Sequence, residues 1–242
     1  VVCSLKNRKF YYILSDVYPD GLIRLEKLYS KNPIALFWNF INKKILKHAE
    51  KILILGRDMI NWLEKVYAPA KKKAVYIPHW QNENLFHPIE YKNNPFVKEH
   101  GLEEKFVIQY SGNMGLWHDM RTFARTAKKL EFDEVYFLFI GEGVRKKELF
   151  EEWSGEIPKN TKVLPYQPKE KLGETLPACH GALITLREGL EGMAVPSKLY
   201  GILASGVPIL AMVPKESEIG LVVKEENCGY LINPGDENGL IE

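Results

Sequence analysis

Short apolar runs alternate with stretches of helical periodicity along this chain, and this alternation limits the fold more than any other feature. The apolar runs of the second half are bounded by turn residues and are too short for helices, so we predict strands there. The predicted strands span 106–110, 135–140, 162–164, 182–186, 208–211 and 229–232, and the predicted helices span 120–130, 169–176 and 197–204. This order indicates an α/β fold with a doubly wound parallel sheet, which binds ligands at the carboxyl ends of its strands.

The first 82 residues show the same alternation with fewer strands. We predict strands at 10–14, 51–55 and 74–77 and helices at 39–49 and 57–66. About three strands are too few for a doubly wound sheet, so residues 1–82 are interpreted as the carboxyl-terminal part of a longer domain. Residues 83–101, rich in Pro and Asn and without periodicity, are predicted to be a linker. Residues 102–242 are then a second domain, and we expect the chain to be a fragment.

Composition excludes several classes of protein. The chain is 45% hydrophobic and 26% charged, which is typical of a globular domain. Its longest apolar runs, 34–38 and 135–140, are far shorter than the roughly 20 residues of a membrane span. Cys3, Cys179 and Cys228 lack the spacing of metal ligands, so we expect free thiols in a reducing compartment and therefore a cytoplasmic protein.

The net charge of +2 conceals an asymmetry. Residues 1–100 hold 17 basic and 9 acidic residues, whereas residues 101–242 hold 16 and 22. The basic half favours an anionic surface, such as the inner face of the cell membrane, although basic residues also simply solvate helix faces. An apolar stripe beside lysines on one helix suits either docking on anionic lipid or packing against the domain's own sheet. The apolar residues are Phe37, Trp38, Phe40, Ile41, Ile45 and Leu46, and the lysines are Lys43, Lys44, Lys47 and Lys51.

A glycine-containing turn, Ser111–Gly115, follows one predicted strand and precedes a predicted helix. Glycine lets backbone N–H groups approach a phosphate, and a helix N-terminus favours negative charge. The third glycine of the dinucleotide fingerprint is missing, and such turns also occur for steric reasons alone. His118 follows closely and is either a donor to phosphate or a polar residue at a helix end.

The segment from Arg187 to Gly201 is more informative. Two carboxylates and two glycines form a loop after a predicted strand, and Pro196 suits the start of a helix. Ser197 and Lys198 then fall in the first turn, where free N–H groups stabilise an anion. A lysine at this position opposes the helix dipole unless it serves a bound anion, so Lys198 is either a phosphate ligand or a surface lysine.

The order of these motifs resembles family-4 retaining glycosyltransferases of the GT-B fold, in the branch that builds bacterial capsule, lipopolysaccharide or colanic-acid-type polysaccharide. The matching motifs are the glycine turn, EGMAVPSKLYGILASGVPIL at 191–210, GYLINPGD at 229–236, DVYPD at 16–20 and IPHW at 77–80. The resemblance implies two Rossmann-like doubly wound domains, the first incomplete and the second without its carboxyl-terminal helix. It also implies a nucleotide-diphosphate sugar donor, often a UDP-sugar, and a glycan or lipid-linked acceptor. The sugar would be transferred with retention of configuration, without a cofactor, an essential metal or a nucleic-acid partner.

The resemblance also assigns roles to residues. It implies uracil beside the loop 165–168, the diphosphate near the glycine turn and the helix 196–204, and the sugar at the loop 188–192. The predicted donor-binding residues are Gly112, Asn113, Gly115, Gly141, Tyr166, Gln167, Arg187, Glu188, Gly192 and Ser197. The predicted catalytic residues are Glu191, which orients the sugar, and Lys198 and His118, which stabilise phosphate charge together with Arg187.

The sequence departs from the wider family at three positions. Asn113 and His118 stand where arginine and lysine are usual, and Gly201 stands where a ribose-binding glutamate is usual. We expect Ser197, Lys198 and Arg187 to supply the missing groups. These departures leave open a non-catalytic module that binds a nucleotide or glycan, and the architecture is shared with nucleotide-sugar epimerases. The Pro-Ser-Lys helix favours transfer.

Overall fold

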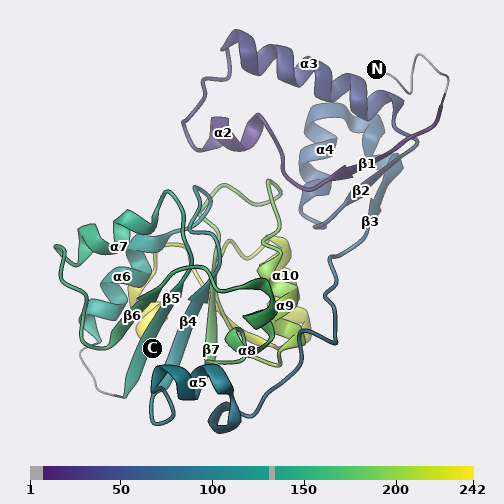
Figure 1. Cartoon of the computed structure of the whole chain (residues 1–242). Coiled ribbons are helices and arrows are strands. Elements are labelled where there is room, and N and C mark those ends of the chain that lie inside the picture. Colours follow the sequence, from purple (N-terminus) through teal and green to yellow (C-terminus); the bar gives the residue numbers. More distant parts are fainter. Residues whose placement is uncertain (1–7, 131–133) are drawn as a thin grey trace. The chain divides into compact units, whose positions relative to one another are not determined.

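The computed structural model describes residues 8–130 and 134–242, and it divides the chain into two compact units (Figure 1). Unit 1 comprises Val1–His79, Gly189–Pro196 and Glu216–Glu218, and unit 2 comprises Trp80–Glu188, Ser197–Lys215 and Ile219–Glu242. The predicted linker 83–101 groups with unit 2 and contains η2 (Tyr91–Asn93) and α5 (Pro95–His100). Two short segments of the predicted second domain therefore belong structurally to the first unit.

Unit 2 is built on six parallel strands in the order β6-β5-β4-β7-β8-β9. Figure 1 labels the first four strands of this order. The strands are β4 (Phe106–Ser111), β5 (Val135–Ile140), β6 (Thr161–Leu164), β7 (Gly181–Thr185), β8 (Ile209–Met212) and β9 (Gly229–Ile232). The helices are α6 (Met120–Lys129), α7 (Lys146–Glu152), η3 (Lys169–Lys171), α8 (Leu172–Thr175), α9 (Lys198–Ala204), α10 (Glu218–Glu226) and α11 (Glu237–Ile241). The strand order reverses direction between β4 and β7, which is where doubly wound sheets bind ligands.

Apolar side chains on both faces explain why these strands are central. All of β7 is buried, and β4 is buried from Val107 to Tyr110. Their side chains meet Phe123 of α6 and Trp153 beyond α7 in one core. The carboxylate of Asp119 caps α6 by accepting hydrogen bonds from the N–H groups of Arg121 and Thr122. Capping by Asp119 fixes the start of α6 at Met120, shortly after the glycine turn.

Unit 1 contains a smaller parallel sheet, in the order β1-β2-β3. Its elements are β1 (Tyr11–Leu14), α2 (Asp20–Arg24), α3 (Pro33–His48), β2 (Lys51–Ile54), α4 (Met59–Tyr67), η1 (Ala68–Lys73) and β3 (Ala74–Tyr76). Three strands match the number expected for this part of the chain. The helix α3 begins earlier than the predicted residue 39, because Asn32 caps it through Ile34 N–H and Pro33 suits its first position.

The structure also bears on the cysteines, on metal ligands and on membrane-spanning helices. Cys179 and Cys228 are free thiols, whereas Cys3 lies outside the described residues. Within residues 8–130 and 134–242, no group of three or more His, Cys, Asp or Glu side chains is placed to hold a metal ion. Over the same residues, no helix has both the length and the apolar character required to cross a membrane.

Candidate functional site

The carboxyl edge of the unit 2 sheet gathers most of the predicted site residues. The glycine turn follows β4, Gly141 follows β5, Tyr166 lies beyond β6, and Arg187 lies beyond β7. The helix α9 begins at Lys198, at this same edge of the sheet. The strand order reverses between β4 and β7, and we call this position the switch point. The fold therefore collects residues that are distant in sequence at the edge where such sheets bind ligands.

Backbone conformation and close packing favour glycine at two of the predicted site positions, Gly112 and Gly141. Gly112 and Gly141 have φ values of +131° and +132°, and a Cβ atom on Gly141 would lie 2.0 Å from the carbonyl oxygen of Gly112. The N–H group of Gly112 donates to the carbonyl of Ile140, and the N–H group of Met114 donates to that of Glu142. These two donors of the turn are thus already used within the fold, so side chains must supply much of the charge at any anion site here.

Lys198 supplies a buried charge directly at this turn. Its Nζ atom is buried and donates a hydrogen bond to no group among the described residues. It lies 3.7 Å from the centre of the Tyr110 ring, and a Cβ atom on Gly112 would lie 3.2 Å from it. Burial lowers the pKa of Lys198 to about 7. A buried ammonium with an aromatic face but no acceptor is well suited to receive an anion.

His118 lies at the same edge but differs from its predicted role. Its Nδ1 atom lies 2.8 Å from the carbonyl oxygen of Thr185, and since a carbonyl only accepts, Nδ1 carries the proton. Burial, together with the nearby Lys198 and Arg145 charges, lowers the pKa of His118 to about 3. The ring is therefore neutral near pH 7, with a lone pair on Nε2. This differs from the expectation that His118 stabilises phosphate charge, and it agrees with the alternative of a polar residue near a helix start.

The other predicted residues of unit 2 are more exposed. The hydroxyl of Tyr166 donates to the Glu142 carbonyl at 3.3 Å, and the Gln167 amide donates to the Pro165 carbonyl at 3.0 Å. Arg187 and Glu188 have exposed side chains, and the Arg187 N–H group donates to the Trp117 carbonyl. Ser197 is exposed and makes no capping hydrogen bond to α9. These side chains can meet a ligand from solvent without rearranging the core.

Glu191 and Gly192 lie elsewhere, in the segment Gly189–Pro196 of unit 1. The N–H group of Gly192 donates to the Asp58 carboxylate at 2.8 Å. An Arg24 nitrogen lies 3.8 Å from Oε1 of Glu191. Glu191 and Gly192 of the predicted sugar loop are therefore held by a different unit from the predicted phosphate-binding residues, whereas Glu188 belongs to unit 2.

Gly201, which stands where a glutamate is usual, is buried in α9. A Cβ atom there would lie 3.0 Å from Cδ1 of Leu176 and 3.7 Å from Cε1 of Phe86. Those apolar neighbours favour a small residue, so Gly201 contributes to packing and offers no group to a ribose.

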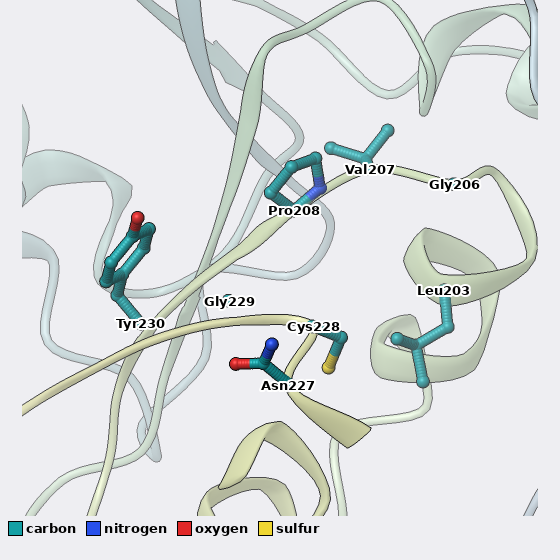
Figure 2. A pocket seen from close by; sticks show the side chains of 8 residues that line it. All are labelled: Leu203, Gly206, Val207, Pro208, Asn227, Cys228, Gly229 and Tyr230. Carbon is teal, nitrogen blue, oxygen red and sulfur yellow. The ribbon is translucent and has the colours of Figure 1, made fainter.

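One cavity of about 490 Å³ lies at the opposite edge of the unit 2 sheet (Figure 2). Gly206, Pro208, Cys228 and Tyr230 are among its lining residues, at the amino ends of β8 and β9. Ligands of doubly wound sheets bind at the carboxyl ends, so this cavity is not the candidate site.

Tyr110, Arg24 and Asp58 are among the residues that contact predicted site residues although the sequence analysis did not single them out. Tyr110 lies in an apolar strand, where the sequence pattern predicts only a core residue. Arg24 and Asp58 are each more than a hundred residues from their partners in the loop. Nothing in local periodicity pairs residues at such separations.

Comparisons with known proteins identify the family of this chain. A protein-family model described as "Glycosyl transferases group 1" matches residues 93–242. The chain is 28% identical over 237 residues to "Probable glycosyltransferase WbjE" of Pseudomonas aeruginosa. It is 25% identical over 180 residues to "Putative colanic acid biosynthesis glycosyl transferase WcaI" of Escherichia coli K12. The alignments cover 96% and 72% of this chain but 58% and 43% of those proteins, so the chain spans about half the length of these relatives.

Solved structures show the same relationship at the level of the fold. The complex of Anabaena Alr3699/HepE with UDP and glucose has a TM-score of 0.74 at 14% identity, covering 99% of this chain and 61% of that one. WaaG, a glycosyltransferase involved in lipopolysaccharide biosynthesis, has a TM-score of 0.75 at 15% identity, covering 96% of this chain and 63% of that one.

Proposed function

Because this chain belongs to the glycosyl transferases group 1 family, we propose that it binds a nucleotide-diphosphate sugar and that the protein transfers this sugar to a glycan or lipid-linked acceptor. The chain has the GT-B fold. The name of WcaI refers to colanic acid biosynthesis, and WaaG is involved in lipopolysaccharide biosynthesis. We assign this protein to the same class of cell-envelope polysaccharide synthesis, with UDP as the nucleotide, as in the complexes of Alr3699/HepE.

The buried Nζ atom of Lys198 is the observation that carries this proposal. It lies at the switch point of a doubly wound sheet, beside Gly112, with no hydrogen-bond acceptor among the described residues. A buried charged donor without a partner is costly unless a ligand completes it. A diphosphate supplies both the negative charge and the acceptor oxygens.

The same arrangement accounts for catalysis. When the bond between the anomeric carbon and the phosphate oxygen breaks, its electron pair stays on the phosphate and the sugar gains positive character. The oxygen of the acceptor hydroxyl then forms the new bond to that carbon, and its proton passes to the departing phosphate oxygen. Lys198 stabilises the growing phosphate charge, which accelerates the reaction because this charge is larger in the transition state than in the substrate. Glu191 orients the sugar hydroxyls, and retention of configuration follows the family resemblance.

Lys198 also motivates the proposal that no metal ion is required, because this protein cation can neutralise phosphate charge that a metal ion would otherwise neutralise. The experiment is a thermal-shift panel of UDP-, GDP- and dTDP-sugars with and without EDTA, on this chain and on its Lys198→Ala variant. We expect a UDP-sugar to stabilise the chain in EDTA and the variant to lose most of that effect. Stabilisation that requires Mg²⁺ or Mn²⁺ contradicts the metal-free part. Equal shifts in the variant contradict the assignment of Lys198.

A binding module without catalysis is the second candidate, favoured by Gly201, which leaves this position without a ribose ligand. Product analysis separates the candidates when the full-length protein is incubated with the selected donor and a lipid-linked acceptor. A transferase releases UDP and a longer glycan, an epimerase yields the isomeric sugar, and a binding module yields neither.

We also propose that α3 docks on an anionic membrane surface, where a lipid-linked acceptor would be found. Its apolar residues divide into two groups: Leu46 is buried in unit 1, whereas Ile34, Phe37 and Phe40 are 65%, 66% and 52% exposed. The burial of Leu46 agrees with packing inside unit 1, and the exposed residues leave an apolar surface that supports the docking proposal. Lysines occupy the same helix, and Nζ of Lys44 lies 4.5 Å from the centre of the Phe40 ring. Exposed aromatic groups beside lysines suit the boundary between lipid headgroups and acyl chains.

A further inference from the structure

The loop that carries Glu191 is fastened to unit 1 at several points. The N–H group of Val17 donates to the Met193 carbonyl at 2.8 Å, and Asp16 pairs with Ala194 in an isolated antiparallel bridge. Through these backbone contacts the loop packs against unit 1 beside Asp16 and Val17. Its conformation is thus set by residues close to the start of the chain.

Arg24, the last residue of α2, fixes the part of the loop around Glu191. Its guanidinium donates to the carbonyl oxygens of Gly189 and Glu191, at 2.5 and 3.3 Å, and one nitrogen lies 3.8 Å from Oε1 of Glu191. One side chain therefore restrains both the backbone and the carboxylate of Glu191. The planar guanidinium can hold several oxygens at fixed angles, which a lysine ammonium cannot do.

The second carboxylate oxygen of Glu191 is an acceptor without a donor. Oε2 is buried and accepts no hydrogen bond from the described residues. A carboxylate with one oxygen near a cation and the other unsatisfied is ready to accept a hydroxyl group. Sugar hydroxyls are donors of this kind.

Asp58 holds the other end of the loop and is itself buried. Its Oδ2 atom accepts hydrogen bonds from the N–H groups of Gly192 and Glu218, at 2.8 and 3.1 Å. Gly192 has a φ of +72°, and a Cβ atom on it would lie 2.8 Å from the Asp58 carbonyl oxygen. Only glycine permits this approach, so the loop has little freedom to shift relative to Asp58.

We infer that Arg24 is a positioning residue for donor-sugar recognition: with Asp58 as the second anchor, it presents Glu191 to a sugar hydroxyl and leaves recognition of the nucleotide diphosphate to other residues. This inference rests on the proposed function and names a residue that sets the sugar contact. It implies that the sugar contribution to donor binding can be removed without weakening the binding of UDP.

The test measures binding of UDP and of UDP-glucose, or of the UDP-sugar that stabilises the chain most in the panel above, by calorimetry on this chain and three variants. Arg24→Ala removes the contacts, Arg24→Lys keeps the charge without the planar donor set, and Lys71→Ala removes an exposed ion pair with Glu64 in the same unit as a control. We expect Arg24→Ala to weaken UDP-sugar binding about five- to tenfold while UDP affinity stays within about twofold. Arg24→Lys should restore only part of the loss, and Lys71→Ala should change neither affinity.

Equal losses for UDP and the UDP-sugar, or no loss for either, overturn the inference. A second readout does not depend on donor binding: a protease specific for glutamate should cleave after Glu188 or Glu191 several-fold faster in Arg24→Ala, and unchanged cleavage also overturns the inference. If the unaltered chain binds no nucleotide sugar, the proposed function fails, while the protease result still decides whether Arg24 holds the loop. A circular-dichroism melt of each variant separates loop release from unfolding.

Discussion

The ammonium group of Lys198 lies 3.7 Å above the ring of Tyr110, whose hydroxyl donates to the carbonyl of Asn113 at 2.7 Å. One tyrosine thereby joins the glycine turn to the start of α9. Attraction between a buried cation and an aromatic ring is worth about 2 kcal/mol, but the ring supplies no acceptor. The lowered pKa of Lys198 shows that desolvation still dominates in the free chain.

The first prediction is that Lys198→Met stabilises the ligand-free chain. Replacing a buried charge that lacks an acceptor with an apolar side chain of similar length should raise the free energy of unfolding by about 1–3 kcal/mol at pH 7. Urea unfolding measures this, with Lys171→Met, which removes an exposed ion pair with Glu99, as the control. A destabilised Lys198→Met variant would show that the ammonium has an internal partner.

The stability gained by Lys198→Met should decrease as the pH rises. The Lys198 pKa is about 7 in the folded chain and near its ordinary value of 10.5 when unfolded, so between these values the unfolded chain binds more protons. Wild-type stability therefore rises with pH across that window. The advantage of Lys198→Met should be largest below pH 7 and should shrink towards pH 10.

The second prediction concerns donor binding. An anion beside Lys198 favours its charged form, so binding of a UDP-sugar takes up a proton and the affinity should fall about tenfold or more between pH 6.5 and pH 9. Calorimetry in buffers of different ionisation enthalpy measures the uptake directly. The arginine of Lys198→Arg remains charged throughout this range, so the affinity of this variant for the UDP-sugar should not vary with pH. A wild-type affinity that does not vary with pH contradicts a role for Lys198 in binding.

The third prediction is that His118 contributes no charge. Its Nδ1–H group donates to the carbonyl of Thr185, and its pKa is about 3. His118→Asn, whose amide nitrogen can replace Nδ1, should therefore change UDP affinity less than about threefold, compared with about tenfold or more for Lys198→Ala. Comparable losses in the two variants would restore His118 as a phosphate ligand.

The fourth prediction tests Glu191 in the whole protein, for which we propose sugar transfer. Glu191→Gln keeps the size of the side chain but removes the charge, and it should lower the transfer rate while UDP affinity stays within a few fold. A rate assay with saturating donor, together with calorimetry, separates the two effects. An unchanged rate would move the sugar contact to Glu188 or another residue.

The fifth prediction concerns α3. Co-sedimentation with vesicles containing anionic lipid should exceed that with neutral vesicles, and high salt should weaken it, because each lysine near an anionic surface contributes about 1 kcal/mol. Phe37→Ser with Phe40→Ser should abolish binding, since both side chains are exposed, whereas Tyr230→Ser in unit 2 serves as an exposed aromatic control. Equal partitioning in every condition would contradict membrane docking.

The order of strands and helices was readable from the sequence because it depends on local patterns. Apolar runs with their turn residues predicted β5 and β9 at the bounds that the structure has. The motif from Glu191 to Leu210 carried the family resemblance, which the family match shows to be right. Helix ends were predicted less well, as at α3, because a capping residue outside the apolar pattern decides them.

Only the tertiary structure decided how the predicted site residues are held. Residues 189–196 look continuous with the donor-side domain in sequence, yet Arg24 and Asp58 bind them to unit 1. The position of His118 in the sequence suits either a donor to phosphate or a polar residue at a helix end, but burial near Lys198 lowers its pKa and keeps it neutral. The physical reason is the same in both cases. Hydrogen bonds and desolvation depend on which groups folding brings within a few ångströms, whereas sequence patterns report only neighbours along the chain.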